Sequence, residues 1–435
     1  MINKLNFWLL LIAMSFATVA AEEPKTEIVK DGENYSLHIN GVEVYLKGIN
    51  GRLESTELAV LATNYGANAL RIIMLTERNE FTTLTMPAIR WAVQQNMYVL
   101  AYLEALSRNP ADYTEQYKAT KREEVRIMVE KLKDIENVFM IMIGNELDHG
   151  IHENDVSQRA PIYKFVNELV LLVKSICPNK LVSTAISQST RVKIIDAVVD
   201  YCPAIDVLSL NTYGDIVYVD NGVKNSKWNG AYFISEWGED GYWGTSKTSW
   251  GASIEQTSEQ KRSQLESRYA AAFKDKLPRC LGSFYFYWGS RWEYTPTWFN
   301  AFVEKNASVG INGEQSAVAD ALHQCWKGTA PAQTAPVVTD ITIDGKIPAS
   351  NIKVSANANF ISSVTATDKE QSSLTYKWEI LEDTGKRSAS PSITKSTNIN
   401  TATFSVPAAG NYRLYVYVLD GTGRVGTANI PFQVR

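Results

Sequence analysis

The chain has 435 residues, of which 45% are hydrophobic and 21% are charged, and its formal net charge is −4. This composition indicates a globular protein that is long enough for a large domain and a small one. Acidic and basic residues are interspersed without a basic stripe, which argues against nucleic acid as a partner.

The first residues have the pattern of a targeting segment. Lys4 supplies a positive charge, residues 7–16 are mostly apolar, and a run of small residues ends at Ala21. This pattern predicts a secretory signal peptide over residues 1–21, cut after Ala21. No later apolar run approaches the roughly 18 residues that a membrane-spanning helix needs. We therefore expect a monomer that is secreted or periplasmic and has no membrane span.

Apolar, strand-like runs alternate with helical stretches from about residue 42 to residue 326. Continuous apolar strands that alternate with helices are typical of a parallel sheet covered by helices. Eight such units predict an α/β fold, a closed (β/α)8 TIM barrel, with a doubly wound open sheet as the alternative. The predicted strands are Val42–Ile49, Ala67–Met74, Met97–Leu103, Val138–Ile143, Leu181–Ala185, Ile205–Asn211, Tyr232–Ser235 and Leu281–Tyr287.

Helices are expected between most of these strands. The gap between the sixth and seventh strands is short, so a reduced helix is expected there. The clearest helical stretches are Thr85–Gln95, Lys121–Ile135, Ile162–Ile176 and Ser258–Asp275.

The composition changes after Trp326. Residues 327–336 are rich in Pro, Ala and Thr and are expected to form a linker. Residues 337–435 contain short alternating strands separated by turns, which predicts a small Ig-like β-sandwich with Trp378 buried in its core. The predicted division is therefore a signal peptide, a catalytic barrel over residues 22–326, the linker and the sandwich. The predicted sandwich strands are Ile341–Ile343, Ser363–Thr367, Thr375–Leu381, Thr401–Val406, Asn411–Leu419 and Ala428–Val434.

Four cysteines follow the predicted cleavage site. Export would permit disulfides, and four cysteines allow three connectivities. We favour the pairs Cys177–Cys202 and Cys280–Cys325, with four free structural thiols as the alternative.

A glutamate follows the fourth predicted strand, in the sequence Gly144, Asn145, Glu146. A carboxylate is costly to desolvate, so it seldom adjoins a buried apolar strand without a reason. Catalytic groups of parallel barrels lie at the C-terminal ends of the strands. There, Glu146 would protonate the leaving oxygen of a glycosidic bond, and Asn145 would hydrogen-bond the sugar 2-hydroxyl. The alternative is a strand that meets a solvated acidic loop.

A second glutamate, Glu236, follows the seventh predicted strand. Its predicted role is the nucleophile that attacks the anomeric carbon and forms a glycosyl-enzyme intermediate. Glycoside hydrolysis needs one carboxylic acid and one carboxylate at the same sugar bond, so the two glutamates together are more informative than either alone.

An acid/base after the fourth strand and a nucleophile after the seventh resemble the pattern of glycoside hydrolase clan A. The resemblance covers the barrel, roughly residues 40–326. It implies a retaining mechanism with the two carboxyl groups about 5 Å apart. It also implies that Arg71 hydrogen-bonds the nucleophile and keeps it ionised, that Tyr213 contacts the same carboxylate, and that Trp288 forms the floor of the −1 subsite. The alternatives are a surface ion pair for Arg71 and core packing for Tyr213.

Further aromatic side chains near the predicted active end are candidate sugar platforms, and ordinary loop packing is the alternative for each. Trp237 and Trp243 are the two that we assign to substrate binding. The others in the loops after the seventh and eighth strands are Tyr242, Trp250, Trp292 and Tyr294.

Other titratable residues lie near the same strand ends. Glu77 and Glu104 are candidate contacts for sugar hydroxyls. His149 and His152 form an E-x-x-H-x-x-H string with Glu146, but no partner motif supports a metal site. We expect neither a cofactor nor a metal.

The barrel followed by one Ig-like domain resembles the two-domain bacterial endo-β-1,3-glucanases of glycoside hydrolase family 158. The strand-end segments are also similar to clan barrels of families 2, 5 and 72. The hypothesis is a retaining glycoside hydrolase that acts on a β-glucan, with an endo-β-1,3-glucanase favoured. Hydrolysis of β-1,4-glucan or mannan, β-1,3-glucan transglycosylation, and polysaccharide binding by an inactive barrel stay open.

Overall fold

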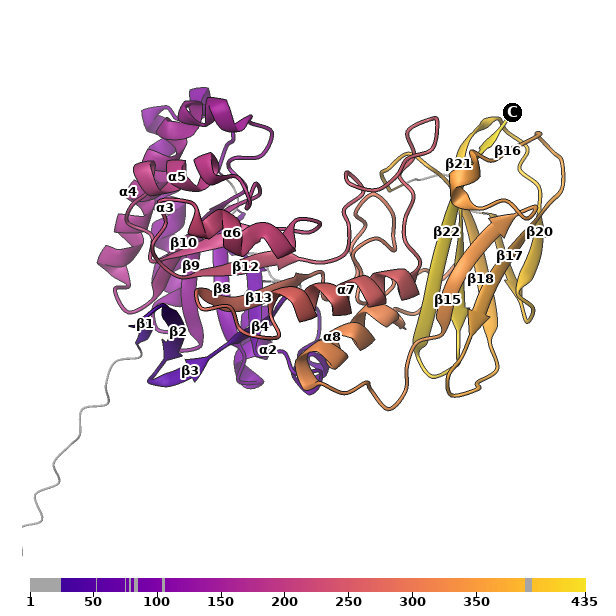
Figure 1. The fold of residues 1–435 in the computed structure, drawn as a ribbon, viewed down its shortest axis with the longest axis horizontal. Helices are drawn as coiled ribbons and strands as arrows, with labels where there is room; N and C mark the ends of the chain where they lie inside the picture. Colours follow the sequence, from indigo (N-terminus) through magenta and orange to yellow (C-terminus); the bar gives the residue numbers. More distant parts are fainter. Residues whose placement is uncertain are drawn as a thin grey trace, which may run out of the picture.

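The computed structural model describes residues 25–51, 53–74, 76–77, 80–81, 85–103, 106–387 and 393–435. The predicted signal peptide, residues 1–21, lies outside these residues. The described chain forms a closed barrel and a β-sandwich that lie side by side along the long axis of the molecule (Figure 1). The predicted fold class is confirmed, and the closed ring of strands rules out the doubly wound open sheet.

Eight parallel strands close the barrel, and each one contains or overlaps a strand that the sequence predicts. All eight residues of β9 are buried, as expected for a strand between a packed interior and a layer of helices. In chain order the strands are β4 (Leu46–Asn50), β5 (Ala69–Ile73), β8 (Tyr98–Leu103), β9 (Val138–Asn145), β10 (Leu181–Ile186), β11 (Val207–Asn211), β12 (Tyr232–Trp237) and β13 (Cys280–Phe286).

Helices cover the outside of the barrel. Helix α4 places one apolar stripe, including Phe165, Leu169 and Val173, in the core. Helix α7 begins with a capping box in which Thr257 and Gln260 satisfy each other's backbone N–H groups. The helix between the sixth and seventh barrel strands is short, as predicted. The helices are α1 (Thr56–Asn64), α2 (Thr85–Gln94), α3 (Glu115–Leu132), α4 (Ala160–Ile176), α5 (Val192–Tyr201), α6 (Val219–Lys224), α7 (Ser258–Ala272) and α8 (Ala317–Lys327).

A small antiparallel sheet precedes the barrel and was not predicted. It consists of β1 (Thr26–Asp31), β2 (Asn34–Ile39) and β3 (Val42–Val44), so the first predicted strand is divided between β3 and β4. The backbone of this sheet bonds to Asn179 and Pro278, which lie just before β10 and β13. Its apolar side chains, such as Leu37, pack with the interior of the barrel. The sheet therefore closes the N-terminal end of the barrel and leaves the C-terminal end for a site.

The C-terminal domain has two sheets, as a sandwich requires. One contains β15 (Val337–Ile343), β17 (Phe360–Thr367) and β20 (Thr401–Phe404). The other contains β16 (Lys353–Val354), β18 (Thr375–Glu382), β19 (Ile393–Thr397), β21 (Gly410–Leu419) and β22 (Arg424–Val434), of which β16 and β19 were not predicted. Trp378 is fully buried in the core of this domain, as predicted.

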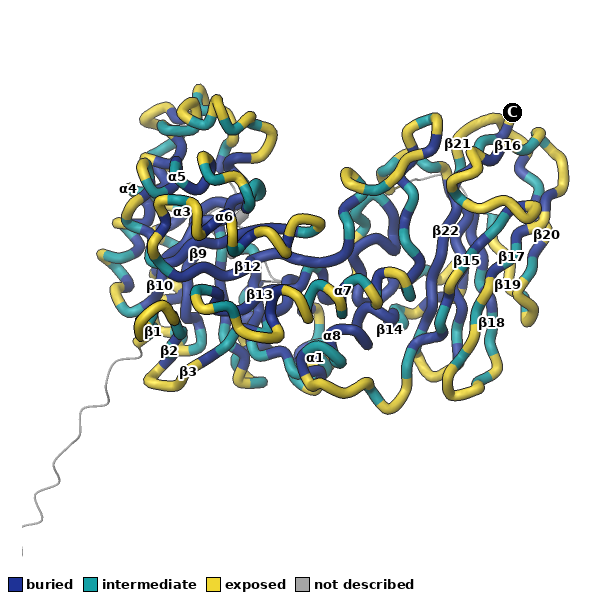
Figure 2. Tube along the Cα trace, viewed as in Figure 1, coloured by how far each residue is buried: buried dark blue, intermediate teal, exposed yellow. Residues whose placement is uncertain are grey.

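The barrel and the sandwich share a sheet and a core. A short strand that precedes α8, β14 (Gln315–Ser316), pairs in parallel with β22 of the sandwich. Buried segments continue through the junction in Figure 2. The linker region is also held, because the buried Ala335 donates its N–H to Asp320 of α8 at 2.7 Å. The apolar side chains that meet at the junction are Val303, Val309, Ile311, Leu381, Tyr415, Tyr417 and Val425.

The preferred disulfide pairs were wrong, because all four cysteines are free thiols. Cys177 and Cys202 are the C-caps of two different helices, α4 and α5. Cys280 is buried at the start of β13, where its Sγ lies 3.7 Å from the Gly282 carbonyl oxygen, and Cys325 lies on α8. Among the described residues, no helix has the length and apolar character needed to cross a membrane.

Candidate active site

The end of β9 turns sharply to present Glu146. Between Met142 and Asn145 this strand has one residue more than the opposing residues 183–185 of β10, which is a β-bulge. Gly144 has φ of 79° and Glu146 has φ of 54°, both in the left-handed region that non-glycine residues rarely adopt. Such backbone strain at a strand end is typical of functional positions.

The environment of Glu146 favours a protonated carboxyl group. Burial is the largest cause and the neighbouring Glu236 carboxylate adds to it, and together they raise the pKa of Glu146 to about 7. Two groups act in the opposite direction. Asn211 Nδ2 donates to Glu146 Oε1 at 3.0 Å, and Arg108 Nη2 lies 3.7 Å from Glu146 Oε2. The side chain is 21% exposed, so it opens to solvent.

Glu236 is re-aimed by a second bulge. Leu210 of β11 lies opposite Ile234 of β12, but the next residue, Asn211, lies opposite Glu236. The extra residue on β12 breaks the alternation of the strand, and Glu236 turns toward the end of the barrel while Trp237 turns outward.

Polar donors fix Glu236 on both carboxylate oxygens. Arg71 Nη1 lies 2.7 Å from Oε1, and the Tyr213 hydroxyl donates to Oε2 at 3.2 Å. Arg71 is 1% exposed and its guanidinium lies 4.0 Å from the centroid of the Tyr102 ring. A buried guanidinium and a tyrosine hydroxyl, one on each oxygen, fix the orientation of this carboxylate. The structure therefore brings together Arg71, Tyr213 and Glu236, as the resemblance to clan A implies.

Side-chain amides connect the two glutamates. Asn145 Oδ1 accepts from Arg71 Nη2 at 2.9 Å and from Asn211 Nδ2 at 3.1 Å. Asn211 also bonds Glu146, and Asn50 Oδ1 accepts from Arg71 Nη1 at 2.6 Å. Sequence reasoning did not assign roles to Asn50 and Asn211. A signal was present, because both are polar residues that end an apolar barrel strand, as Asn145 does.

Aromatic rings line one side of this centre. Trp243 is 56% exposed and meets Tyr213 edge-on, with the ring centroids 5.5 Å apart. Phe286 ends β13, is partly exposed and lies 6.4 Å from Tyr213. An exposed ring beside Tyr213, which contacts Glu236, offers a flat face on which a sugar could stack. Trp243 therefore has the position of a platform, and Phe286 is a further candidate that the sequence analysis missed.

Two tryptophans predicted as sugar contacts are buried instead. Trp237 is 0% exposed and packs on the outer side of β12 against Phe273 and Tyr285. Trp288 is also 0% exposed, and its ring packs against Phe302 while its Nε1 donates to a carbonyl of α1. These side chains belong to the core, so they leave no face for a sugar.

The other titratable residues near these strand ends are Glu77, Glu104, His149 and His152. Glu104 lies outside the described residues, and so does the side chain of Glu77. His149 Nδ1 lies 3.9 Å from Glu146 Oε2, and His152 caps the following 3₁₀ helix, Glu153–Arg159. Within the part of the chain that the structure describes, no group of three or more His, Cys, Asp or Glu side chains is arranged to hold a metal ion.

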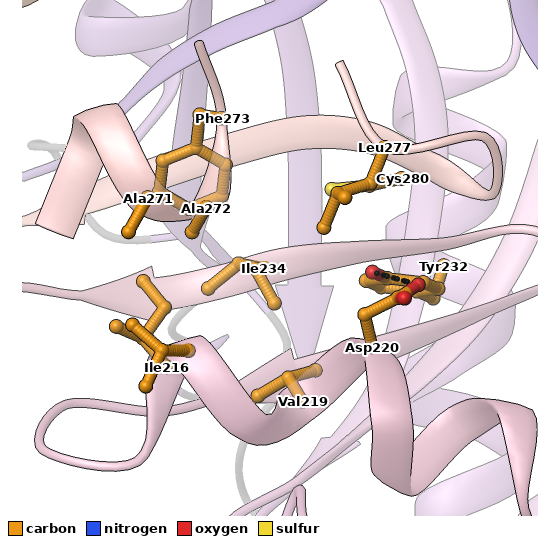
Figure 3. Close-up of a pocket in the computed structure, with 11 residues that line it drawn as sticks. Ile216, Val219, Asp220, Tyr232, Ile234, Ala271, Ala272, Phe273, Leu277 and Cys280 are labelled. Atoms are coloured by element: carbon orange, nitrogen blue, oxygen red, sulfur yellow. Dashed lines mark hydrogen bonds between the residues drawn. The ribbon is translucent and has the colours of Figure 1, made fainter. Parts of the chain in front are cut away.

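A small cavity in the barrel wall is separate from this centre. Figure 3 shows it between β12, the short helix α6 and the end of α7, with Ile216, Tyr232 and Cys280 in its lining. The Tyr232 hydroxyl donates to Asp220 at 3.2 Å across it. Its volume is about 20 Å³, which is room for about one water molecule and not for a sugar.

The fold is similar to that of other solved structures. A β-glucuronidase 2 of Bacteroides uniformis, covalently bound to cyclophellitol-6-carboxylate aziridine, is 13% identical with a TM-score of 0.51 over 94% of this chain. The match spans 48% of that protein, so the chain covers about half of its length. A variant of Saccharomyces cerevisiae Gas2p in complex with laminaritetraose and laminaripentaose is 12% identical with a TM-score of 0.50, over 71% of this chain and 68% of that one.

The fold is shared with both proteins. At these identities the similarity concerns the fold alone. No protein-family model matches the sequence, and no curated protein matches it.

Proposed function

We propose that the protein is a retaining glycoside hydrolase that cleaves a β-glucan by double displacement. Glu236 is the nucleophile that attacks the anomeric carbon, and Glu146 is the acid that protonates the leaving oxygen and then the base that activates water. No cofactor takes part in these steps.

One observation carries the proposal: the two glutamates have opposite environments within one hydrogen-bonded network. Arg71 and Tyr213 donate hydrogen bonds to the two carboxylate oxygens of Glu236 and orient it. Burial and the charge of Glu236 raise the pKa of Glu146 to about 7, so this group is largely protonated in mildly acidic solution and is about half protonated at neutral pH. Pairs of carboxyl groups whose environments separate their protonation states are how glycosidases assign acid and nucleophile.

The proposed substrate is a β-1,3-glucan cleaved within the chain. Two observations support this choice: the resemblance of the barrel and Ig-like domain to family 158, and a shared fold with Gas2p, which binds laminari-oligosaccharides. The exposed ring of Trp243 beside Tyr213 suits stacking on a neutral pyranose.

The test is product analysis on laminarin, barley glucan, cellulose and mannan, with Glu146→Gln and Glu236→Gln beside the native protein. We expect release of short oligosaccharides from laminarin and loss of turnover by a factor of at least about 100 in either variant. Release only from cellulose or mannan would overturn the β-1,3 assignment. Absence of sugar release from all four by a folded native protein would favour the alternative, a polysaccharide-binding protein on an inactive barrel.

A further inference from the structure

We propose that Arg413 of the sandwich is a positioning residue for the substrate-binding loop of the barrel, residues 238–257, which carries Trp243. The consequence for catalysis rests on the proposed function, but the coupling itself does not. The sandwich would then be a working part of the active site and not a separate binding module.

Arg413 is fully buried and its partners come from both domains. Within the sandwich it pairs with Asp383, Nη2 to Oδ2 at 3.0 Å, and donates from Nη1 to Asn429 Oδ1 at 2.6 Å. Its Nη2 also donates to the backbone carbonyl of Ser253, in the loop, at 2.8 Å. A buried guanidinium must satisfy its donors, so this contact ties the loop to the sandwich.

A second buried connection runs beside the first. Asn429 Nδ2 donates to Glu255 Oε2, also in the loop, at 2.6 Å. Glu255 is buried and pairs with Lys261 of α7 at 2.6 Å. The backbone N–H of Thr427 in β22 donates to the Ser258 hydroxyl at 2.9 Å. The end of the loop is therefore held by the sandwich at several points.

Further contacts connect Ser253 to Tyr242, near the start of the loop. The Ser253 N–H donates to the Tyr294 hydroxyl at 3.0 Å, and the Ser253 hydroxyl donates to the backbone carbonyl of Tyr242 at 2.7 Å. The rings of Tyr242 and Tyr294 are stacked with centroids 5.0 Å apart, and the Arg413 guanidinium lies 5.7 Å from the Tyr294 ring.

The last contacts reach the nucleophile. Trp243 meets the Tyr242 ring edge-on at 4.9 Å and the Tyr213 ring at 5.5 Å. Tyr213 in turn donates to Glu236. Since Trp243 is 56% exposed, it depends on these neighbours for its orientation. Loss of the Arg413 anchor would let the platform move without removing any group that touches substrate.

The experiment compares Arg413→Met with Arg424→Met in the full-length chain labelled with 5-fluorotryptophan. Arg424 forms the matched control, because it makes another ion pair between the sandwich and the barrel, to Asp320 at 2.7 Å. That partner lies on α8 and not in the loop. The ¹⁹F resonance of Trp243 is assigned by its absence in Trp243→Phe.

We expect Arg413→Met to shift or broaden the Trp243 resonance and to raise KM for the β-glucan about tenfold, with a smaller change in kcat. Arg424→Met should leave the resonance and KM unchanged. A folded Arg413→Met protein with an unmoved Trp243 resonance and an unchanged KM would overturn the proposal.

A milder variant covers the case in which Arg413→Met does not fold. Tyr294→Phe removes the hydroxyl that accepts the Ser253 N–H and keeps the stacked ring, and it should also move the Trp243 resonance. An unmoved resonance in that variant would overturn the proposal. The NMR measurement needs no substrate, so absence of activity on every glycan would contradict the proposed function and leave the coupling tested separately.

Discussion

Arg71 donates from Nη1 to Oε1 of Glu236 at 2.7 Å, while Nη2 of the same guanidinium bonds Asn145, the residue before Glu146. One buried cation therefore contacts Glu236 directly and reaches Glu146 only through side-chain amides. This asymmetry gives Glu236 a direct ion pair, whereas burial is the largest cause of the raised pKa of Glu146.

Replacement of Arg71 by Met should abolish activity and weaken the fold. The substitution leaves the Glu236 carboxylate, which is 11% exposed, without its cation. Breaking a buried pair in this way costs about 3 kcal/mol of unfolding free energy. Urea unfolding and turnover measure the two effects.

The matched control is the double variant Arg71→Met/Glu236→Gln. It should recover most of the stability, because no unpaired charge remains, but none of the activity. If Arg71→Met alone kept native turnover, Arg71 would have no part in fixing the nucleophile.

The alkaline side of the pH–rate profile should follow the ionisation of Glu146. The acid must carry a proton to act, and its pKa is about 7, so kcat/KM should fall as the pH rises through about 7. The charge of Arg108 lowers this pKa, and Arg108→Gln should therefore move the alkaline limb to higher pH. A shift to lower pH, or an unmoved limb, would contradict the assignment of that limb to Glu146.

The same group should make the fold less stable at higher pH. The pKa of Glu146 is raised from 4.5 to about 7, so the folded state binds the proton more tightly than the unfolded state. This contribution is present below pH 4.5 and is lost as the pH rises to about 7. Glu146→Gln should show a flatter fall of melting temperature between those values, measured by calorimetry. An identical pH dependence in both proteins would contradict the raised pKa.

Substitution of three tryptophans should distinguish a role in substrate binding from a role in core packing. Trp243→Ala should raise KM with little change in melting temperature, because the ring is exposed. Trp237→Ala and Trp288→Ala should each cost about 3 to 5 kcal/mol of stability, because both rings are buried. A stable Trp288→Ala protein with a raised KM would contradict core packing and support the predicted role of Trp288 in substrate binding.

All four cysteines should titrate as thiols. They are free in the structure, and the three that are buried, Cys177, Cys202 and Cys280, should react with iodoacetamide only after unfolding. Mass spectrometry without prior reduction should find four alkylated cysteines. If two of the four alkylations were absent, the two unmodified cysteines would be joined in a disulfide, which would contradict the free thiols of the structure.

The strand series was predictable because buried parallel strands are continuous apolar runs, as in β9 and β12. The sheet β1–β3 was missed because most residues of its strands are exposed or half-buried, so they do not form a continuous apolar run, and tertiary packing against the barrel interior stabilises them.

The active-site assignments also divide into those that follow from the local sequence and those that depend on tertiary packing. Residue type and strand order singled out Glu146 and Glu236, the resemblance to clan A added Arg71 and Tyr213, and the structure joins all four in one hydrogen-bonded network. The outward turn of Trp237 could not be predicted, because it depends on a bulge that is visible only in the pairing of β12 with β11 and β13. The burial of Trp288 likewise depends on packing between segments far apart in the chain.

The most direct test is the anomeric configuration of the first product, followed by ¹H NMR on whichever β-glucan the protein cleaves. Double displacement through Glu236 predicts that the β-anomer appears first and that the α-anomer grows in only by mutarotation. Initial release of the α-anomer would contradict Glu236 as nucleophile and Glu146 as its acid/base partner.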